Sequence, residues 1–212
     1  MKIESEVVLL PGVVGQIETT IDKPSQQRQG YVAVCCHPHP LHGGTMGNKV
    51  VYTASRSFAG LGILSFRFNF RGVGESEGAY AEGQGEQQDL VAVVNWVQRE
   101  LPECKLLLAG FSFGAYISAM QAKSLSADML VSIAPPIGRI EYKGFAPPNC
   151  PWLVVQGDED ELVDADQVED WVNGLDQSPE LHRLPETTHF FHRKLVNLRR
   201  IVEQFTIKSL EL

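Results

Sequence analysis

The feature of this chain that most restricts its fold is a regular alternation of short apolar runs with segments of helical spacing. Residues 31–36 (Tyr-Val-Ala-Val-Cys-Cys) are apolar without interruption, which is typical of a strand covered on both faces. Similar runs predict strands over residues 63–68, 105–111, 129–134 and 152–156. Between and after them, helices are predicted over residues 48–59, 87–99, 113–122, 166–175 and 195–208.

The remaining short runs complete a sheet. Residues 7–10 and 17–21 predict an opening antiparallel hairpin, and residues 180–184 predict an edge-like strand. Strands and helices that alternate in this way predict an α/β fold with a doubly wound, mostly parallel sheet and helices on both faces. No linker or repeat interrupts the pattern, so we expect residues 1–212 to form one domain. In such sheets the functional site lies at the carboxyl ends of the strands, so its residues should directly follow predicted strands.

The charge and cysteine content disfavour several classes of partner. The chain carries 18 basic and 26 acidic side chains and a formal net charge of −8, which argues against binding to nucleic acid. Its first residues are acidic where a signal peptide is basic, and no apolar run approaches the ~20 residues that cross a bilayer. We therefore expect no membrane partner. The four cysteines form no Cys-x-x-Cys pair, which favours reduced thiols in a cytoplasmic protein.

The sequence Gly110-Phe111-Ser112-Phe113-Gly114 matches the pattern Gly-x-Ser-x-Gly. It ends a predicted strand and begins a predicted helix without a linker, which is the setting of a nucleophile elbow. The turn is tight, and the two glycines allow neighbouring backbone to pass close to it. A serine N-cap with glycines that serve only packing is the alternative. The context favours Ser112 as a catalytic nucleophile.

A serine nucleophile needs a base, and the base needs an acid that holds its tautomer. Of the histidines that follow Ser112, His189 lies in a loop after the strand at residues 180–184 and is preferred. His192 is the alternative and is expected to begin the last helix. The acid should follow the strand at residues 152–156, and the spacing after the glycine favours Asp160, with Asp158 as the alternative.

The loop after residues 31–36 is expected to supply part of an oxyanion hole. One donor should be the backbone N–H of Phe113, directly after the serine. The other should come from the loop His37-Pro38-His39-Pro40-Leu41-His42-Gly43-Gly44. Since proline has no N–H, His39 is the preferred donor and Leu41 the second choice. A metal cluster formed by the loop's three histidines is the rival interpretation. The expected chemistry needs neither a metal nor a cofactor.

Two longer motifs give the chain a family resemblance. Residues 37–50 (His-Pro-His-Pro through Gly-Gly-Thr-Met-Gly-Asn-Lys-Val) and residues 67–78 (Arg-Phe-Asn-Phe-Arg-Gly-Val-Gly-Glu-Ser-Glu-Gly) resemble small bacterial α/β-hydrolases of the dienelactone-hydrolase and esterase branch. The resemblance implies a Ser112, Asp160 and His189 triad and an eight-stranded sheet whose second strand is antiparallel. His37-Pro38 stands where many relatives carry His-Gly, and Asn69 stands where they often carry Asp, at an expected structural position.

These observations predict a serine hydrolase that cleaves small carboxylic esters by acyl transfer, a carboxylesterase-like enzyme. Thioesters, lactones or peptides are alternative substrates, and a binding module of the same fold is an alternative function. Residues 135–150 are too short for a helical cap domain, so the site should be open. Aromatic residues and prolines in this segment are candidates for an apolar wall of the site or for core closure: Tyr142, Phe145, Pro147 and Pro148. The sequence leaves the physiological substrate and the oligomeric state open.

Overall fold

The computed structural model describes residues 1–212 and contains one eight-stranded sheet. The strands lie in the order β1-β2-β4-β3-β5-β6-β7-β8. β2 is antiparallel to both its neighbours, and every other pair is parallel, as the family resemblance implies. The strand bounds are β1 Ile3–Pro11, β2 Gln16–Pro24, β3 Tyr31–Cys36, β4 Leu64–Phe68, β5 Lys105–Phe111, β6 Met129–Ile133, β7 Trp152–Gly157 and β8 Glu180–Leu184.

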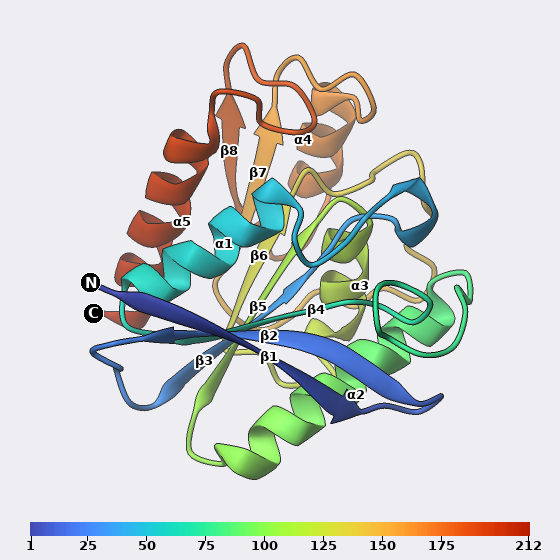
Figure 1. Ribbon diagram of the computed structural model, residues 1–212. Helices are drawn as coiled ribbons and strands as arrows, with labels where there is room; N and C mark the ends of the chain where they lie inside the picture. The colour runs from blue at the N-terminus through green and yellow to red at the C-terminus, as the bar shows by residue number, and fades with distance from the viewer.

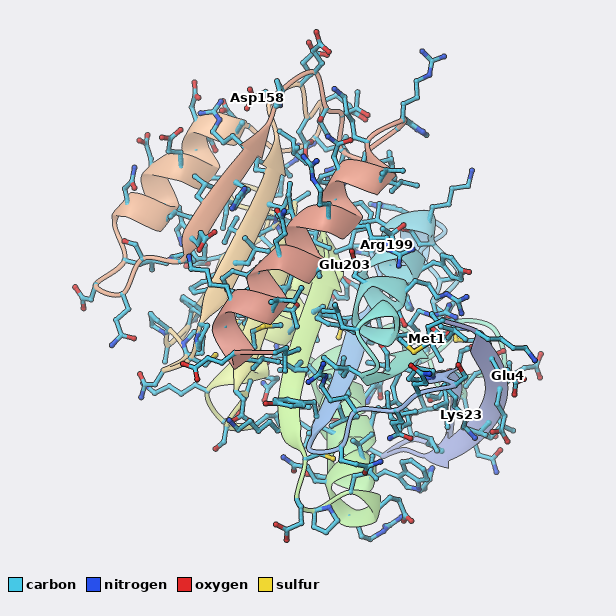
Figure 2. The ribbon with its side chains drawn as sticks, turned by 90° about the vertical axis from the view of Figure 1, so that its left-hand side faces the viewer. Met1, Glu4, Lys23, Asp158, Arg199 and Glu203 are labelled. Carbon is cyan, nitrogen blue, oxygen red and sulfur yellow. The ribbon has the colours of Figure 1, made fainter.

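Helices cover both faces of the sheet (Figure 1). On one face lie α1 (Lys49–Gly60) and α5 (Leu195–Leu210), and on the other lie α2 (Gln84–Glu100), α3 (Phe113–Ala122) and α4 (Ala165–Asn173). α1 and α5 pack closely because Gly60 leaves room for Arg199. Arg199 also pairs with Glu203 one turn later on α5, at 2.7 Å (Figure 2).

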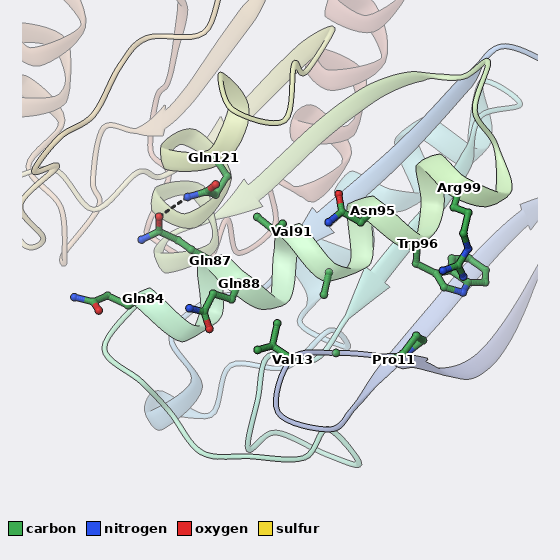
Figure 3. Close-up of a pocket in the computed structure, with 12 residues that line it drawn as sticks. Pro11, Val13, Gln84, Gln87, Gln88, Val91, Asn95, Trp96, Arg99 and Gln121 are labelled. Carbon is green, nitrogen blue, oxygen red and sulfur yellow. Dashed lines mark hydrogen bonds between the residues drawn. The ribbon is translucent and has the colours of Figure 1, made fainter.

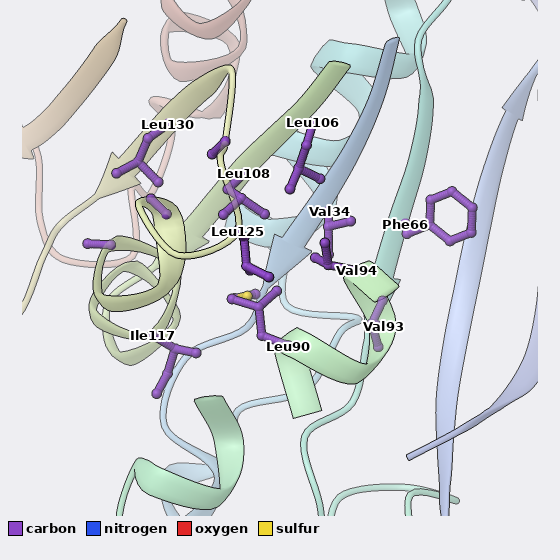
Figure 4. Close-up of a cluster of buried hydrophobic side chains, with 14 of the residues drawn as sticks. Val34, Phe66, Leu90, Val93, Val94, Leu106, Leu108, Ile117, Leu125 and Leu130 are labelled. Atoms are coloured by element: carbon purple, nitrogen blue, oxygen red, sulfur yellow. The ribbon is translucent and has the colours of Figure 1, made fainter. Parts of the chain in front are cut away.

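The core consists of two apolar clusters, one on each face of the sheet. Successive residues of a strand point to opposite faces, so Val34 and Cys36 of β3 join the cluster under α2 and α3, whereas Cys35 joins the one under α1 and α5. Figure 4 shows the first cluster, where Leu106 and Leu108 of β5 pack with α2 side chains. Burial on both faces explains why the central strands are apolar at most positions.

The predicted elements are confirmed, with shifts of a few residues at their ends. The largest shift is at β1, which begins at Ile3 rather than Val7. Among the helices the largest is at α2, which begins at Gln84 rather than Gln87. The carboxylate of Glu86 accepts a hydrogen bond from the N–H of Gly83 at 2.7 Å and so stabilises an earlier start than apolar spacing reveals. α5 begins at Leu195, and His192 lies in the preceding turn, so the expectation that His192 begins the helix is wrong.

The connection between β6 and β7 contains no helix, as predicted, so no cap covers the carboxyl ends of the strands. Asp158, just after β7, lies at that end of the molecule, far from Glu4 and Lys23 of the first hairpin (Figure 2). None of the helices is both long enough and apolar enough to cross a membrane.

Candidate active site

Ser112 lies in the turn between β5 and α3, in a backbone conformation that side chains rarely adopt, with φ +54° and ψ −118°. A Cβ atom on Gly110 would overlap the backbone of Gly114, and one on Gly114 would overlap the carbonyl of Cys36. Both glycines are therefore required by close backbone approach, as the motif predicts. The N–H of Ser112 donates to the carbonyl of Ile133 at 2.8 Å, which ties the turn to β6.

The structure brings Ser112, His189 and Asp160 together in one chain of hydrogen bonds. His189 follows β8, and its Nε2 lies 3.1 Å from Ser112 Oγ. Its Nδ1 lies 2.8 Å from Asp160 Oδ2. The side chain of His189 is only 3% exposed and that of Asp160 is 0% exposed, whereas Ser112 is half-buried. Ser112 is therefore more accessible than its two buried partners.

Four donors surround the Asp160 carboxylate. Its Oδ2 faces His189 and the side-chain amide of Gln156, at 2.8 and 2.9 Å. Its Oδ1 accepts from the N–H groups of Leu162 and Val163, at 2.9 and 2.8 Å. Burial alone would raise the pKa of Asp160, but the hydrogen bonds from His189 and the two backbone groups hold it below its usual value. Asp160 is therefore a stable carboxylate that fixes the proton of His189 on Nδ1.

The other candidates for base and acid lie outside this chain. Asp158 pairs with Arg183 at 2.9 Å, and its side chain is 38% exposed. His182, on β8, contacts Glu180 instead. His192 is exposed in the turn before α5. The geometry therefore favours Asp160 over Asp158 and His189 over His192.

The loop after β3 is held by two side chains. His37 is fully buried, with Nδ1 against the carbonyl of Pro38 at 2.6 Å and Nε2 accepting from the N–H of Phe70 at 3.0 Å. Burial lowers the pKa of His37 to about 4, so its ring is neutral. Asn69 contacts the N–H of Met46 at 2.8 Å, consistent with a structural position. Since both ring nitrogens of His37 have partners, the loop's histidines do not converge on one point as metal ligands would.

The same loop distinguishes the two candidate backbone donors. The N–H of Leu41 donates to His39 Nδ1 at 3.3 Å, so it is already used. The N–H of His39 donates no hydrogen bond to the backbone. The N–H of Phe113 is the first of α3, where a helix provides no partner for it. The structure therefore leaves both preferred donors free.

A pocket of about 500 Å³ opens beside Ser112. Its wall includes Pro136, Arg139 and Ile140 of the 135–150 segment, whereas the two aromatic candidates take the other role considered for them. Tyr142 and Phe145 pack against each other and against Trp171, and so close the core instead. Eleven residues line the pocket: His39, His42, Tyr80, Ser112, Phe113, Pro136, Arg139, Ile140, Leu162, Val163 and His189.

Two residues at the site are not among those that the sequence motifs indicate. Tyr80 lies in the long loop between β4 and α2, and its hydroxyl meets His39 Nε2 at 3.2 Å. Gln156 is buried in β7, where an amide is unexpected among apolar neighbours. Only the latter carries a hint, since a polar residue that ends a buried strand at the site is a candidate for function.

A second pocket, of about 540 Å³, lies between the β1–β2 turn and α2 (Figure 3). Amide side chains such as Gln87 and Gln121, which contact each other at 2.6 Å, line much of it. It contains none of the residues around Ser112.

The arrangement can activate a hydroxyl as a nucleophile. His189 can take the Ser112 proton on Nε2, while Asp160 stabilises the positive charge that then forms on the ring. Two free N–H groups near the serine are suited to an oxygen that becomes negative.

Comparisons with known proteins agree with this fold. The family model of X-Pro dipeptidyl-peptidases (S15 family) matches residues 15–142. XC6422 from Xanthomonas campestris, an α/β serine hydrolase without a lid, is 46% identical, with a TM-score of 0.93 over 98% of this chain and 96% of that chain. An α/β serine hydrolase homologue from Coxiella burnetii is 44% identical, with a TM-score of 0.90 over 94% and 96%. An uncharacterized protein of Rickettsia prowazekii (strain Madrid E) is 35% identical over 92% of this chain and 86% of its own length.

Proposed function

The chain belongs to the X-Pro dipeptidyl-peptidase (S15) family and has the fold of α/β serine hydrolases without a lid, and from this premise we propose that it hydrolyses small carboxylic esters. The observation that carries the proposal is the chain of hydrogen bonds from Ser112 through His189 to Asp160 beside an open pocket. In this proposal the three residues are a catalytic triad.

The reaction is an acyl transfer in two halves. Ser112 Oγ attacks the ester carbonyl as His189 Nε2 takes its proton, and His189 returns that proton to the leaving alcohol. Water, deprotonated by the same nitrogen, then attacks the acyl-serine and releases the acid. Asp160 keeps its charge throughout and stabilises the imidazolium.

Two backbone groups are proposed to form the oxyanion hole. The N–H groups of Phe113 and His39 are free, and that of Phe113 also lies at the first turn of α3, where the helix dipole favours negative charge. The buried His37 supports preorganisation of the loop, because it links Pro38 to Phe70.

The family name makes peptide hydrolysis the second candidate. Release of a dipeptide from a free N-terminus requires a group that recognises an ammonium ion. The residues that line the pocket include Arg139 but no carboxylate, which favours an uncharged ester over such a peptide. Thioesters and lactones fit the same mechanism.

The sheet, the cysteines and the pocket volume support the expected domain organisation, location and class of partner. All eight strands lie in one sheet, which supports a single domain over residues 1–212. The four free cysteines support a cytoplasmic location. The pocket volume supports a small-molecule partner.

The test is labelling with a fluorophosphonate probe together with turnover of p-nitrophenyl butyrate and of an X-Pro p-nitroanilide dipeptide. We expect the probe to modify Ser112, and Ser112→Ala to reduce kcat for the ester by at least about 10⁴-fold. Ser124→Ala is the matched control and should retain full activity, because Ser124 is an exposed serine in the turn after the C-terminal end of α3. Ester turnover that survives in Ser112→Ala contradicts the mechanism. Faster turnover of the dipeptide than of the ester favours the peptidase.

A further inference from the structure

Tyr80 is the one phenol that lines the pocket beside Ser112. It lies just before α2, in a loop whose end is held by the fully buried Glu86. The Glu86 carboxylate accepts hydrogen bonds from the N–H groups of Ala81 and Gly83, at 2.9 and 2.7 Å. These contacts fix the backbone directly after Tyr80, so the position of its ring is built into the fold.

The hydrogen bonds around His39 determine which of its two ring nitrogens carries the proton. Nδ1 accepts from the N–H of Leu41, so it carries no proton. Burial lowers the pKa of His39, and the neighbouring His42 lowers it further, so the ring is neutral. A neutral ring without a proton on Nδ1 carries it on Nε2. Nε2–H therefore donates to Tyr80 Oη, at 3.2 Å.

The hydroxyl proton of Tyr80 is then left without an acceptor. Tyr80 Oη receives the proton of His39 and takes part in no other hydrogen bond within the protein. Burial raises the pKa of Tyr80, and the charge of Glu86 raises it further, so the phenol keeps its own proton. Since Tyr80 lines the pocket, that proton is available to a molecule bound there.

We propose that Tyr80 is a specificity residue whose hydroxyl donates a hydrogen bond to an acceptor oxygen of the substrate outside the reacting ester group. This inference rests on the proposed ester hydrolysis. The pocket walls on other elements are largely apolar, with Pro136, Ile140 and Leu162 among them. The substrate class is therefore an otherwise apolar ester that carries an ether, hydroxyl or oxo oxygen in its acyl or alcohol part.

The test compares ester pairs of equal size that differ by one oxygen. For the acyl part the pair is p-nitrophenyl methoxyacetate and p-nitrophenyl butyrate. For the alcohol part it is 2-methoxyethyl acetate and butyl acetate. The measured quantity is the ratio of kcat/KM for the ether ester to that for the alkyl ester. We expect this ratio in at least one pair to be about 2- to 10-fold higher in the wild-type enzyme than in Tyr80→Phe, as one neutral hydrogen bond provides.

The comparison between variants removes the intrinsic reactivity of each ester, because the same substrates are used. Tyr116→Phe is the matched control: Tyr116 packs on Phe113 but does not line the pocket, and its ratios should equal those of the wild type. Equal ratios in Tyr80→Phe and wild type for both pairs overturn the inference, including the case where all rates fall together. Wild-type enzyme that hydrolyses none of the four esters contradicts the proposed function instead.

Discussion

Replacing Asp160 with asparagine tests the proposed site most directly, because the change alters charge and proton positions but hardly any volume. The carboxylate offers an acceptor oxygen to each of two pairs of donors. Asparagine has a single acceptor oxygen, and its NH₂ group must face one of the two pairs. Asp158→Asn is the matched control, since Asp158 lies two residues away and pairs with Arg183 at the surface.

Each orientation of the new amide has a different defect: the first blocks proton transfer from Ser112, and the second breaks two buried hydrogen bonds. If the NH₂ group faces Gln156 and His189, the ring must move its proton to Nε2, and it can no longer accept the Ser112 proton. If it faces the N–H groups of Leu162 and Val163, two buried backbone donors lose their acceptor. The first orientation costs about 10⁴ in kcat, or about 5.5 kcal/mol. The second orientation leaves two buried backbone donors unmatched, at a cost of about 3 kcal/mol, so the first orientation is populated. There only the Gln156 amide loses its acceptor, which destabilises the fold by about 1–2 kcal/mol and lowers Tm by about 5 °C for a chain of this size.

The assay is kcat with p-nitrophenyl butyrate at a temperature where both variants are folded, together with thermal unfolding. Asp158→Asn should keep kcat within about twofold and change stability by less than about 1 kcal/mol, since exposed ion pairs contribute little. The reasoning is refuted if folded Asp160→Asn keeps more than a tenth of wild-type kcat. It is also refuted if kcat falls by the same factor in Asp158→Asn as in Asp160→Asn.

Two further predictions concern stability around the same loops. The pKa of His37 is about 4 in the folded protein against 6.5, so only the unfolded chain takes up its proton between these values. The free energy of unfolding should therefore fall by about 3 kcal/mol from pH 6.5 to pH 4; an unchanged pH slope in His37→Asn, measured by urea unfolding, would contradict this. Gly114→Ala forces a Cβ to within 2.6 Å of the His37 carbonyl and should cost about 2 kcal/mol or more. The control Gly47→Ala, whose nearest neighbour lies at 3.5 Å, should unfold at nearly the wild-type temperature, and equal losses in the two variants would count against the packing argument.

Most residues of the candidate site could be predicted because each directly follows a strand in the sequence. Ser112 lies between a strand and a helix, and His189 and Asp160 each follow a parallel strand. The carboxyl ends of parallel strands meet at one edge of the sheet, so residues 77 apart in sequence, such as Ser112 and His189, could be paired in advance. This inference needs only strand direction, and strand direction can be read from apolar runs.

The role of Tyr142 and the presence of Tyr80 at the site both depend on side-chain direction in long connections. Tyr142 was a candidate for the pocket wall, but it turns inward onto Trp171. Ile140, two residues earlier, takes the place at the pocket. Tyr80 lies 32 residues before Ser112 in a loop without periodicity, so no spacing rule relates the two. Irregular backbone has no fixed relation between residue number and side-chain direction, unlike a strand or a helix.

The sequence by itself determined the order of strands and helices, the sharp turn at Ser112 and the absence of a cap, because these depend on local apolar spacing, on glycines and on connection length. Only the tertiary structure placed Asp160 against His189 and Asp158 against Arg183, left the N–H of His39 free while that of Leu41 is used, and brought the hydroxyl of Tyr80 to His39. These outcomes depend on which donors and acceptors meet across the folded chain, and a hydrogen bond is decided by distance and direction in space.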